Sequence, residues 1–190
     1  MKKTIIIASF LGAISVLSGC ATGQQSVESS LLDIAVVGEG KESNTASILL
    51  SKISLHDASL AKLHSLTGQD QPYAKRVYSS FAVAKRTQYW PDIERFIDIA
   101  SEDPAFIITS ESDVVGPNND LMSFLSYYSY KSDKALSTLI RMVPSADGAV
   151  LEQLSSALQI AERGDPARFN KLVLQNGADK TFINQLIMED

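Results

Sequence analysis

The spacing of apolar residues constrains the fold of this chain more than any other feature. From about residue 77 onward, apolar residues recur at i, i+3, i+4 and i+7, which is the period of an amphipathic α-helix. Asp165-Pro166 is typical of a helix start, and Gly164 and Gly177 stand where helices should end. We therefore expect an all-α protein. The stripes are Val77/Tyr78/Phe81/Ala84, Ile93/Phe96/Ile97/Ala100, Leu136/Leu139/Ile140/Val143, Val150/Leu151/Leu154/Leu158/Ala161 and Phe169/Leu172/Val173.

Internal repetition indicates how these helices are organised. Four triplets of mostly apolar residues begin 33, 43 and 33 residues apart, and four aspartates follow them at spacings of 33, 44 and 32. These features predict four units of about 33 residues, with an insertion of about ten residues within 104–122. The triplets are Leu60/Leu63/His64, Ile93/Phe96/Ile97, Leu136/Leu139/Ile140 and Phe169/Leu172/Val173; the aspartates are Asp70, Asp103, Asp147 and Asp179; a serine opens each unit at Ser47, Ser80, Ser123 and Ser156.

The last unit resembles a known repeat family. LVLQNGAD, at 172–179, is similar to the helix-end motif of ankyrin repeats, but Ser156-Ala157-Leu158-Gln159 replaces that family's Thr-Pro-Leu-His signature. GAVLEQLSS and QPYAKRVYSS continue helical stripes where an ankyrin repeat has a polar turn, so each aspartate is expected to be the N-cap of a long helix. The better resemblance is to tetratricopeptide or HEAT-type repeats, which implies stacked helical hairpins in a short α-solenoid. The alternative is a compact helical bundle.

The segment 105–120 does not follow the helical pattern clearly. Phe106-Ile107-Ile108-Thr109 fits either a strand or a helix turn, and the segment also carries Glu111 and Asp113. Paired carboxylates can serve hydrolysis, although a solvated acidic loop is the simpler interpretation.

The N-terminus has the layout of a secretory signal peptide. Lys2 and Lys3 precede a thirteen-residue apolar run at 5–17, whereas a membrane-spanning helix needs about 20 residues. A positive start, a short apolar run and small residues before a cleavage site predict a signal peptide at 1–19.

Leu17-Ser18-Gly19-Cys20 resembles the lipobox of bacterial lipoproteins. The resemblance implies cleavage before Cys20, the only cysteine of the chain, and attachment of a diacylglyceryl group to its sulfur. Residue 21 is Ala rather than the Asp that retains such lipoproteins at the inner membrane, which implies an outer-membrane anchor facing the periplasm. In a Gram-positive cell the same motif implies the outer face of the single membrane.

The rest of the chain is expected to be a short flexible tether at 21–30, after the lipidated cysteine, and a single helical domain at 31–190. Without the signal peptide, 15 basic residues stand against 22 acidic ones, which is a net charge of −7. Nucleic acid binding requires clustered Lys and Arg, so we expect no nucleic acid partner. With one cysteine there is no disulfide framework.

No motif predicts catalysis, a metal site or a cofactor. The stretch around Gly40-Lys41 lacks the first glycine and the final Ser or Thr of a phosphate-binding loop, so Gly38 and Gly40 are interpreted as a break between two helices. His56 and His64 are the only histidines and lie eight residues apart, which makes no zinc site by themselves.

Aromatic residues are the strongest indication of a binding surface. Tyr89, Trp90, Tyr127, Tyr128 and Tyr130 are the candidate partner-binding residues, because tyrosine and tryptophan are enriched at binding hot spots. The sequence thus predicts a lipid-anchored, non-enzymatic scaffold or assembly factor that binds an envelope protein or peptide. The alternative is a peptidoglycan-binding protein or enzyme accessory that uses the acidic 105–120 loop.

Overall fold

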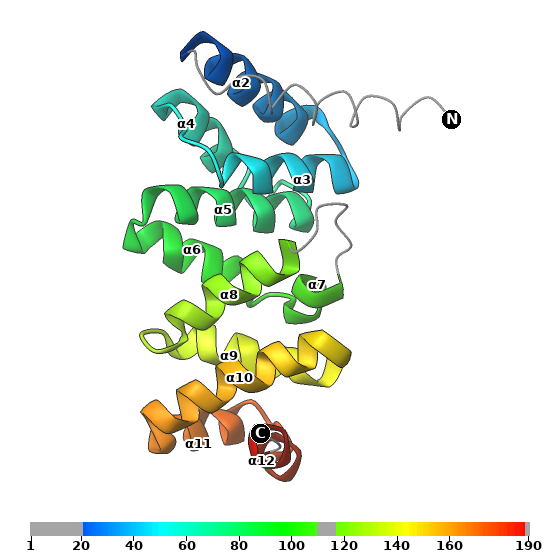
Figure 1. The fold of residues 1–190 in the computed structure, drawn as a ribbon, viewed down its shortest axis with the longest axis vertical. Helices are drawn as coiled ribbons and strands as arrows, with labels where there is room; N and C mark the ends of the chain where they lie inside the picture. Colours follow the sequence, from blue (N-terminus) through cyan, green and yellow to red (C-terminus); the bar gives the residue numbers. More distant parts are fainter. Residues whose placement is uncertain (1–20, 110–116, 189–190) are drawn as a thin grey trace, which may run out of the picture. The chain divides into compact units, whose positions relative to one another are not determined.

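The computed structural model describes residues 21–109 and 117–188, and their regular structure is entirely helical (Figure 1). No β-strand occurs within these ranges, so the all-α prediction is confirmed. The described residues form two compact units that divide between Arg86 and Thr87, here named unit 1 and unit 2. The predicted signal peptide and Cys20 lie outside the described residues, and the single domain predicted at 31–190 stays a prediction.

Unit 1 contains α2 (Ala21–Val37), α3 (Gly40–Leu50), α4 (Asp57–Ser65) and nearly all of α5 (Tyr73–Thr87). Unit 2 contains α6 (Trp90–Ala100), α7 (Pro104–Thr109), α8 (Pro117–Ser129), α9 (Asp133–Met142), the 3-10 turn η1 (Val143–Ser145), α10 (Gly148–Gly164), α11 (Pro166–Gln175) and α12 (Lys180–Met188).

The order of the helices follows the repeat in the sequence. A longer helix is followed by a shorter one in α3–α4, α5–α6, α8–α9 and α10–α11. All four apolar triplets fall in the shorter helices, and all four unit-opening serines fall in the longer ones. The extra helix α7 lies in the segment where the insertion was predicted. The repeat therefore corresponds to helix pairs along the chain.

The four repeated aspartates do not all act as predicted. Asp103 and Asp179 do cap helices, but short ones rather than the long helices predicted: Oδ1 of Asp103 accepts from Phe106 N (3.2 Å) before the six-residue α7, and Oδ1 of Asp179 accepts from Thr181 N (2.8 Å) before the nine-residue α12. Asp147 holds the N-cap position of α10 without a side-chain capping bond. For Asp70 the prediction was wrong: α5 begins three residues later, at Tyr73.

Two other local predictions have definite outcomes. The segment 21–30, predicted as a flexible tether, is instead the first part of α2, in which Glu28 is buried and Val27 packs against the core of unit 1. The helix break at Gly38 and Gly40 is confirmed. A Cβ at Gly38 would lie 2.4 Å from the carbonyl oxygen of Ile34, and Gly40 has a φ of +56°, so both positions favour glycine.

In the segment 105–120, the helical interpretation is correct for Phe106-Ile107-Ile108-Thr109, which belongs to α7. The short helix is capped by Asp103 and buries Ile107. Glu111 and Asp113 lie outside the described residues, so the acidic-loop hypothesis stays a prediction.

The core of unit 1 comes from its four helices. Leu31 and Ala35 of α2 meet buried aliphatic residues of α3, α4 and α5, and α2 packs directly on α3 and α4. Fully burying one such side chain contributes about 1.5–3 kcal/mol. The buried members of this core are Leu31, Ala35, Ala46, Leu50, Leu63, Leu66, Ala82 and Val83.

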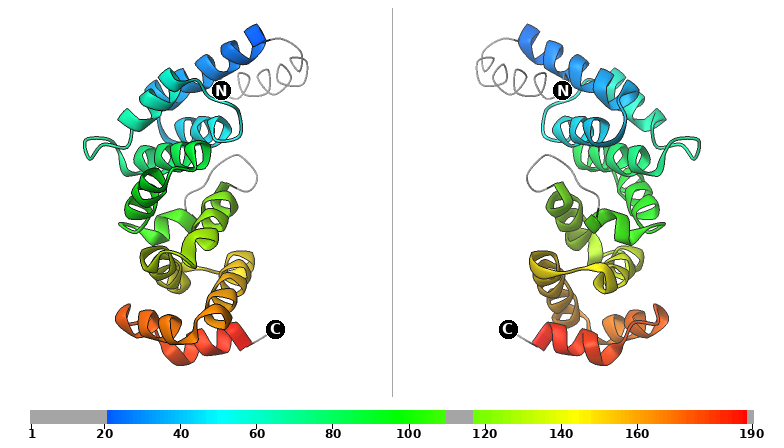
Figure 2. Two further views of the ribbon diagram at one scale, coloured as in Figure 1. Left: turned by 90° about the vertical axis from the view of Figure 1, so that its left-hand side faces the viewer. Right: turned by 90° about the vertical axis from the view of Figure 1, so that its right-hand side faces the viewer.

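Unit 2 is organised around α9. This helix packs against α6, α7, α8, α10 and α11, and six of its ten residues are buried. Helices α11 and α12 in turn pack on α10 (Figure 2). Because α6, α8 and α11 all contact the unit's core, their side chains are held in fixed relation to one another.

Candidate functional site

A group of aromatic rings in unit 2 passes from the buried core to the surface. Phe96 of α6 meets Phe124 of α8 edge to face, with ring centroids 5.6 Å apart, and Phe124 lies 4.8 Å from Tyr128. Tyr128 in turn contacts Trp90 (6.0 Å) and Tyr127 (4.9 Å). The rings at the surface are thus built on a rigid aromatic base.

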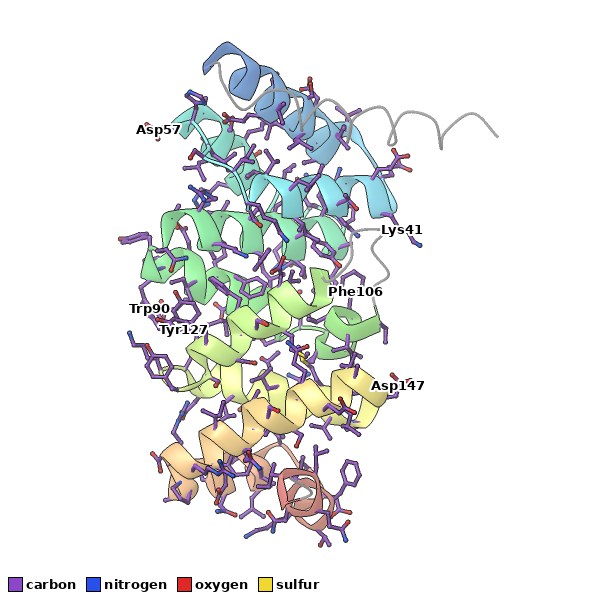
Figure 3. All side chains as sticks on the ribbon, viewed as in Figure 1. Lys41, Asp57, Trp90, Phe106, Tyr127 and Asp147 are labelled. Atoms are coloured by element: carbon purple, nitrogen blue, oxygen red, sulfur yellow. The ribbon has the colours of Figure 1, made fainter. Side chains whose placement is uncertain are left out.

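We name Trp90, Tyr127 and Tyr130, around Tyr128, the aromatic patch. Tyr127 and Tyr130 are 63% and 56% exposed and Trp90 is 37% exposed, whereas Tyr128 is only 6% exposed. Tyr127 stands nearly perpendicular to both Tyr128 (86°) and Tyr130 (85°). Figure 3 shows Trp90 and Tyr127 at the same edge of the molecule. Three large rings therefore face solvent around one buried ring.

The position of Tyr128 is fixed by a hydrogen bond across 40 residues. Its hydroxyl donates to Oε1 of Gln88 at 2.9 Å. Gln88 has a φ of +51° and is the only non-glycine residue with positive φ in the part of the chain that the structure describes. Burial raises the pKa of Tyr128, and the neighbouring Tyr127 and Tyr130 phenols raise it further. Tyr128 therefore keeps its proton at neutral pH and holds the turn that precedes Trp90.

The turn before α6 has a second set of polar contacts. The hydroxyl of Thr87 donates to Oδ2 of Asp92 (2.8 Å) and accepts from the backbone N–H of Tyr89 (3.2 Å). The carbonyl of Tyr89 accepts from the N–H groups of Asp92 and Ile93. These bonds set the direction in which α6 leaves the turn, and hence the placement of Trp90 at its first position.

Arg168 of α11 fixes the other side of the patch. Its Nη2 donates to the carbonyl of Ser129 (2.8 Å), its Nε to Oδ1 of Asp133 (2.6 Å), and its Nη1 lies 3.4 Å from the carbonyl of Tyr130. A cation is favourable at a helix C-terminus, where carbonyl groups lack partners within the helix. Arg168 therefore holds the end of α8 that carries Tyr127 and Tyr130.

The charged side chains nearest the patch have partners. Asp133 is paired with Arg168, and Lys134 with Asp98 at 2.6 Å. The ammonium of Lys131 lies 5.3 Å from the centroid of the Tyr130 ring, and its hydrogen bond with Tyr130 raises the pKa of Lys131. Asp133 and Lys134 thus have partners of opposite charge, whereas the positive charge of Lys131 stands beside the Tyr130 ring without an acidic partner among these contacts.

The structure brings together four of the five residues predicted as partner-binding candidates. Trp90, Tyr127, Tyr128 and Tyr130 are linked by ring contacts. Tyr89 is exposed beside Trp90 in the chain, but it takes no part in these contacts. Tyr128 supports the other rings rather than offering a face of its own.

Sequence reasoning missed Gln88 and Arg168 as supports of the patch. Their partners lie 35–40 residues away along the chain, so no local pattern reveals them. The closest sequence signal is the Asp165-Pro166 start of α11. Asp165 caps this helix through the N–H of Arg168 at 3.0 Å, which confirms the predicted N-cap and places Arg168 in the first turn.

A second polar cluster, in unit 1, joins α2 to α4. The buried Glu28 carboxylate accepts from the backbone N–H of His56 (2.8 Å), and its Oε2 lies 2.6 Å from the Nδ1 of the same residue. The hydroxyl of Ser59 also binds Glu28. Burial acts to raise the pKa of Glu28, but these hydrogen bonds and the His56 charge outweigh it and lower the pKa. The carboxylate thus binds the N-terminus of α4, where the helix dipole favours an anion.

The described side chains contain no group of three or more His, Cys, Asp or Glu that could hold a metal ion. None of the described helices is both long enough and apolar enough to cross a membrane. Comparisons with protein-family models, curated proteins and solved structures give no match for this chain.

Proposed function

We propose that this chain is a lipid-anchored envelope protein that binds a protein or peptide through the aromatic patch and has no catalytic activity. The observation that carries the proposal is the exposure of Trp90, Tyr127 and Tyr130 on a rigid base. Most large aromatic side chains in a folded protein are buried, whereas exposed tyrosine and tryptophan are typical of binding hot spots.

The anchor is Cys20, within Leu17-Ser18-Gly19-Cys20, and the proposed location is the outer membrane with the protein facing the periplasm. One acyl chain binds a membrane only marginally, but two or three hold a protein there stably. Because α2 begins at Ala21, no long linker separates the anchor from the folded chain. The partner must then be reachable close to the membrane surface.

Support for binding rather than catalysis comes from how the polar groups of the two clusters are used. Glu28 is bound to a helix end, and Gln88 and Arg168 hold turns. Rigid positioning of exposed rings reduces the entropy lost on binding, which favours recognition of a partner.

The test is crosslinking of the full chain in the envelope of cells that produce it, followed by capture and identification of the joined protein. Wild type is compared with Tyr127→Ala and with the matched control Phe182→Ala, which removes an exposed aromatic side chain from α12 of the same unit. A Cys20→Ser variant tests the anchor.

We expect one dominant crosslinked protein that is lost in Tyr127→Ala and kept in Phe182→Ala. We also expect Cys20→Ser to leave the membrane fraction. Retention of the chain on isolated cell wall, equal in wild type and Tyr127→Ala and without a crosslinked protein, would instead indicate wall binding and overturn the proposal.

A further inference from the structure

Around the aromatic patch, several hydrogen-bond acceptors of the protein are already bonded, whereas some of its donors are not. The carbonyl of Tyr128 accepts from the N–H groups of Lys131 and Ser132, and the carbonyls of Ser129 and Tyr130 accept from Arg168. The carbonyl of Tyr89 accepts from the N–H groups of Asp92 and Ile93. Oε1 of Gln88 accepts from Tyr128. These five acceptors of the turn and helix end that carry the rings are therefore occupied.

Donors at the same surface remain available. Among the described residues, no protein acceptor is bound to the indole N–H of Trp90 or to the hydroxyl of Tyr127. Indole N–H is a donor only, whereas a phenol can donate and can accept weakly. A ligand that fits must supply hydrogen-bond acceptors to these donors and must itself carry few donors that need an acceptor from the protein.

The charges beside the patch limit which ligands can bind. Asp133 is paired with Arg168, and Lys134 with Asp98. The ammonium of Lys131 contacts the Tyr130 ring. This ammonium has no acidic partner in these contacts, so the patch disfavours a cationic ligand and accepts an uncharged one. Rings of about 5–6 Å centroid spacing that meet edge to face leave no space for a cation enclosed between them.

Proline-rich chain in the polyproline II conformation has these properties. Its backbone carbonyls make no internal hydrogen bonds, its prolines carry no N–H, and its apolar rings pack between aromatic side chains. A sugar fits less well, because each hydroxyl needs an acceptor as well as offering one. An ordinary extended peptide likewise brings N–H donors.

On the basis of the proposed function, we infer that the partner presents an uncharged, proline-rich segment in the polyproline II conformation, which binds across Trp90, Tyr127 and Tyr130. The Trp90 and Tyr127 donors bind its carbonyls, and its proline rings pack against the three aromatic faces. The low entropy of the preformed polyproline II chain favours binding to so small a surface.

The sequence supplies a direct probe, because Trp90 is the only tryptophan of the chain. Its emission is recorded while the detergent-solubilised full chain is titrated with decaproline, with a Gly-Ser decapeptide and with an N-acetylglucosamine tetramer. Circular dichroism of each variant checks that it is folded. Tyr127→Phe, Tyr127→Ala and the control Phe182→Ala are titrated in the same way.

We expect a saturable change with decaproline and none with the other two compounds. Affinity should fall a few-fold in Tyr127→Phe, which loses one hydrogen bond, and roughly tenfold or more in Tyr127→Ala. Phe182→Ala should bind as wild type does. Absence of a saturable change with decaproline, or saturation by the tetramer or the Gly-Ser peptide at equal affinity, would overturn the inference.

The two proposals fail in different ways. A crosslinked envelope protein that depends on Tyr127, together with no decaproline binding, would overturn the polyproline inference and leave the proposed function standing. Decaproline binding that depends on Tyr127, without any crosslinked envelope protein, would support the recognition chemistry and overturn the proposed envelope role.

Discussion

Both units use charged side chains to bind the ends of distant helices, among them an anion at a helix N-terminus in unit 1 and a cation at a helix C-terminus in unit 2. In unit 1 the anion of Glu28 binds the N-terminus of α4, and in unit 2 the cation of Arg168 binds the C-terminus of α8. Both choices match the helix dipole. The difference is burial: Glu28 is enclosed between helices, whereas Arg168 supports a turn whose rings face solvent.

A charged side chain bound to a helix end can either stabilise the core or position a surface. Glu28 joins α2 to α4 and has no exposed surface to position, so its removal should act on stability. Arg168 positions Tyr127 and Tyr130, so its removal should act on binding as well as on stability. The following four predictions test this difference, from the largest expected effect to the smallest.

Glu28→Ala should lower the free energy of unfolding by about 3 kcal/mol, because it leaves the Ser59 hydroxyl and the His56 N–H without their charged acceptor. Urea denaturation followed by circular dichroism measures the change. Asp33→Ala removes an exposed acid from the same helix and should change stability by less than about 0.5 kcal/mol. Equal effects of the two variants would contradict the assigned role of Glu28.

Arg168→Ala should destabilise the protein by about 2 kcal/mol, because it removes charge-assisted bonds to Asp133 and Ser129. It should also weaken decaproline binding, while Glu28→Ala should not. Arg168→Lys should restore only part of the stability and part of the decaproline binding, because lysine lacks the planar fork of donors. Arg163→Ala, at an exposed position of α10, is the control. Unchanged binding in folded Arg168→Ala would show that the turn is positioned without Arg168.

Acidification should selectively weaken unit 1. The folded-state pKa of Glu28 is lowered from its ordinary value of 4.5. Its contribution is therefore fully present above pH 4.5 and is lost as the pH falls through the lower folded value. The loss should be smaller than that caused by Glu28→Ala, since a protonated carboxyl still forms hydrogen bonds. Urea midpoints of wild type and Glu28→Gln at pH 7 and pH 3 measure it, and parallel pH dependence in both would contradict the prediction.

Gln88→Gly should be more stable than Gln88→Ala by about 1 kcal/mol, because only glycine adopts the positive φ of +51° without strain. Both variants lose the hydrogen bond to Tyr128, so the difference between their thermal midpoints reports the backbone strain of a positive φ at residue 88. Equal midpoints would mean that the turn relaxes to a negative φ once the side chain is gone.

The sequence could predict the local features and not the distant contacts. Periodicity gave the helices, and the cap at Asp165 and the break at Gly38 were correct because each depends on residues within one turn. Asp70 failed as a cap because the same residue type also occurs in turns, and the position of α5 is set by packing. The sequence does contain a sign that Glu28 is buried: it stands one turn before Leu31 and Leu32 on the apolar face of its helix.

The sequence by itself determined an all-helical chain of repeated helix pairs and a set of aromatic residues suited to binding, because helical period and residue chemistry are local properties. The tertiary structure decided which of these rings face solvent. Tyr127 and Tyr128 are adjacent in the chain, yet one is exposed and the other buried, because Tyr128 packs against Trp90 and Phe124 and donates to Gln88. It also decided that Gln88 and Arg168 support the patch, since bonds across 35–40 residues depend on how the helices pack.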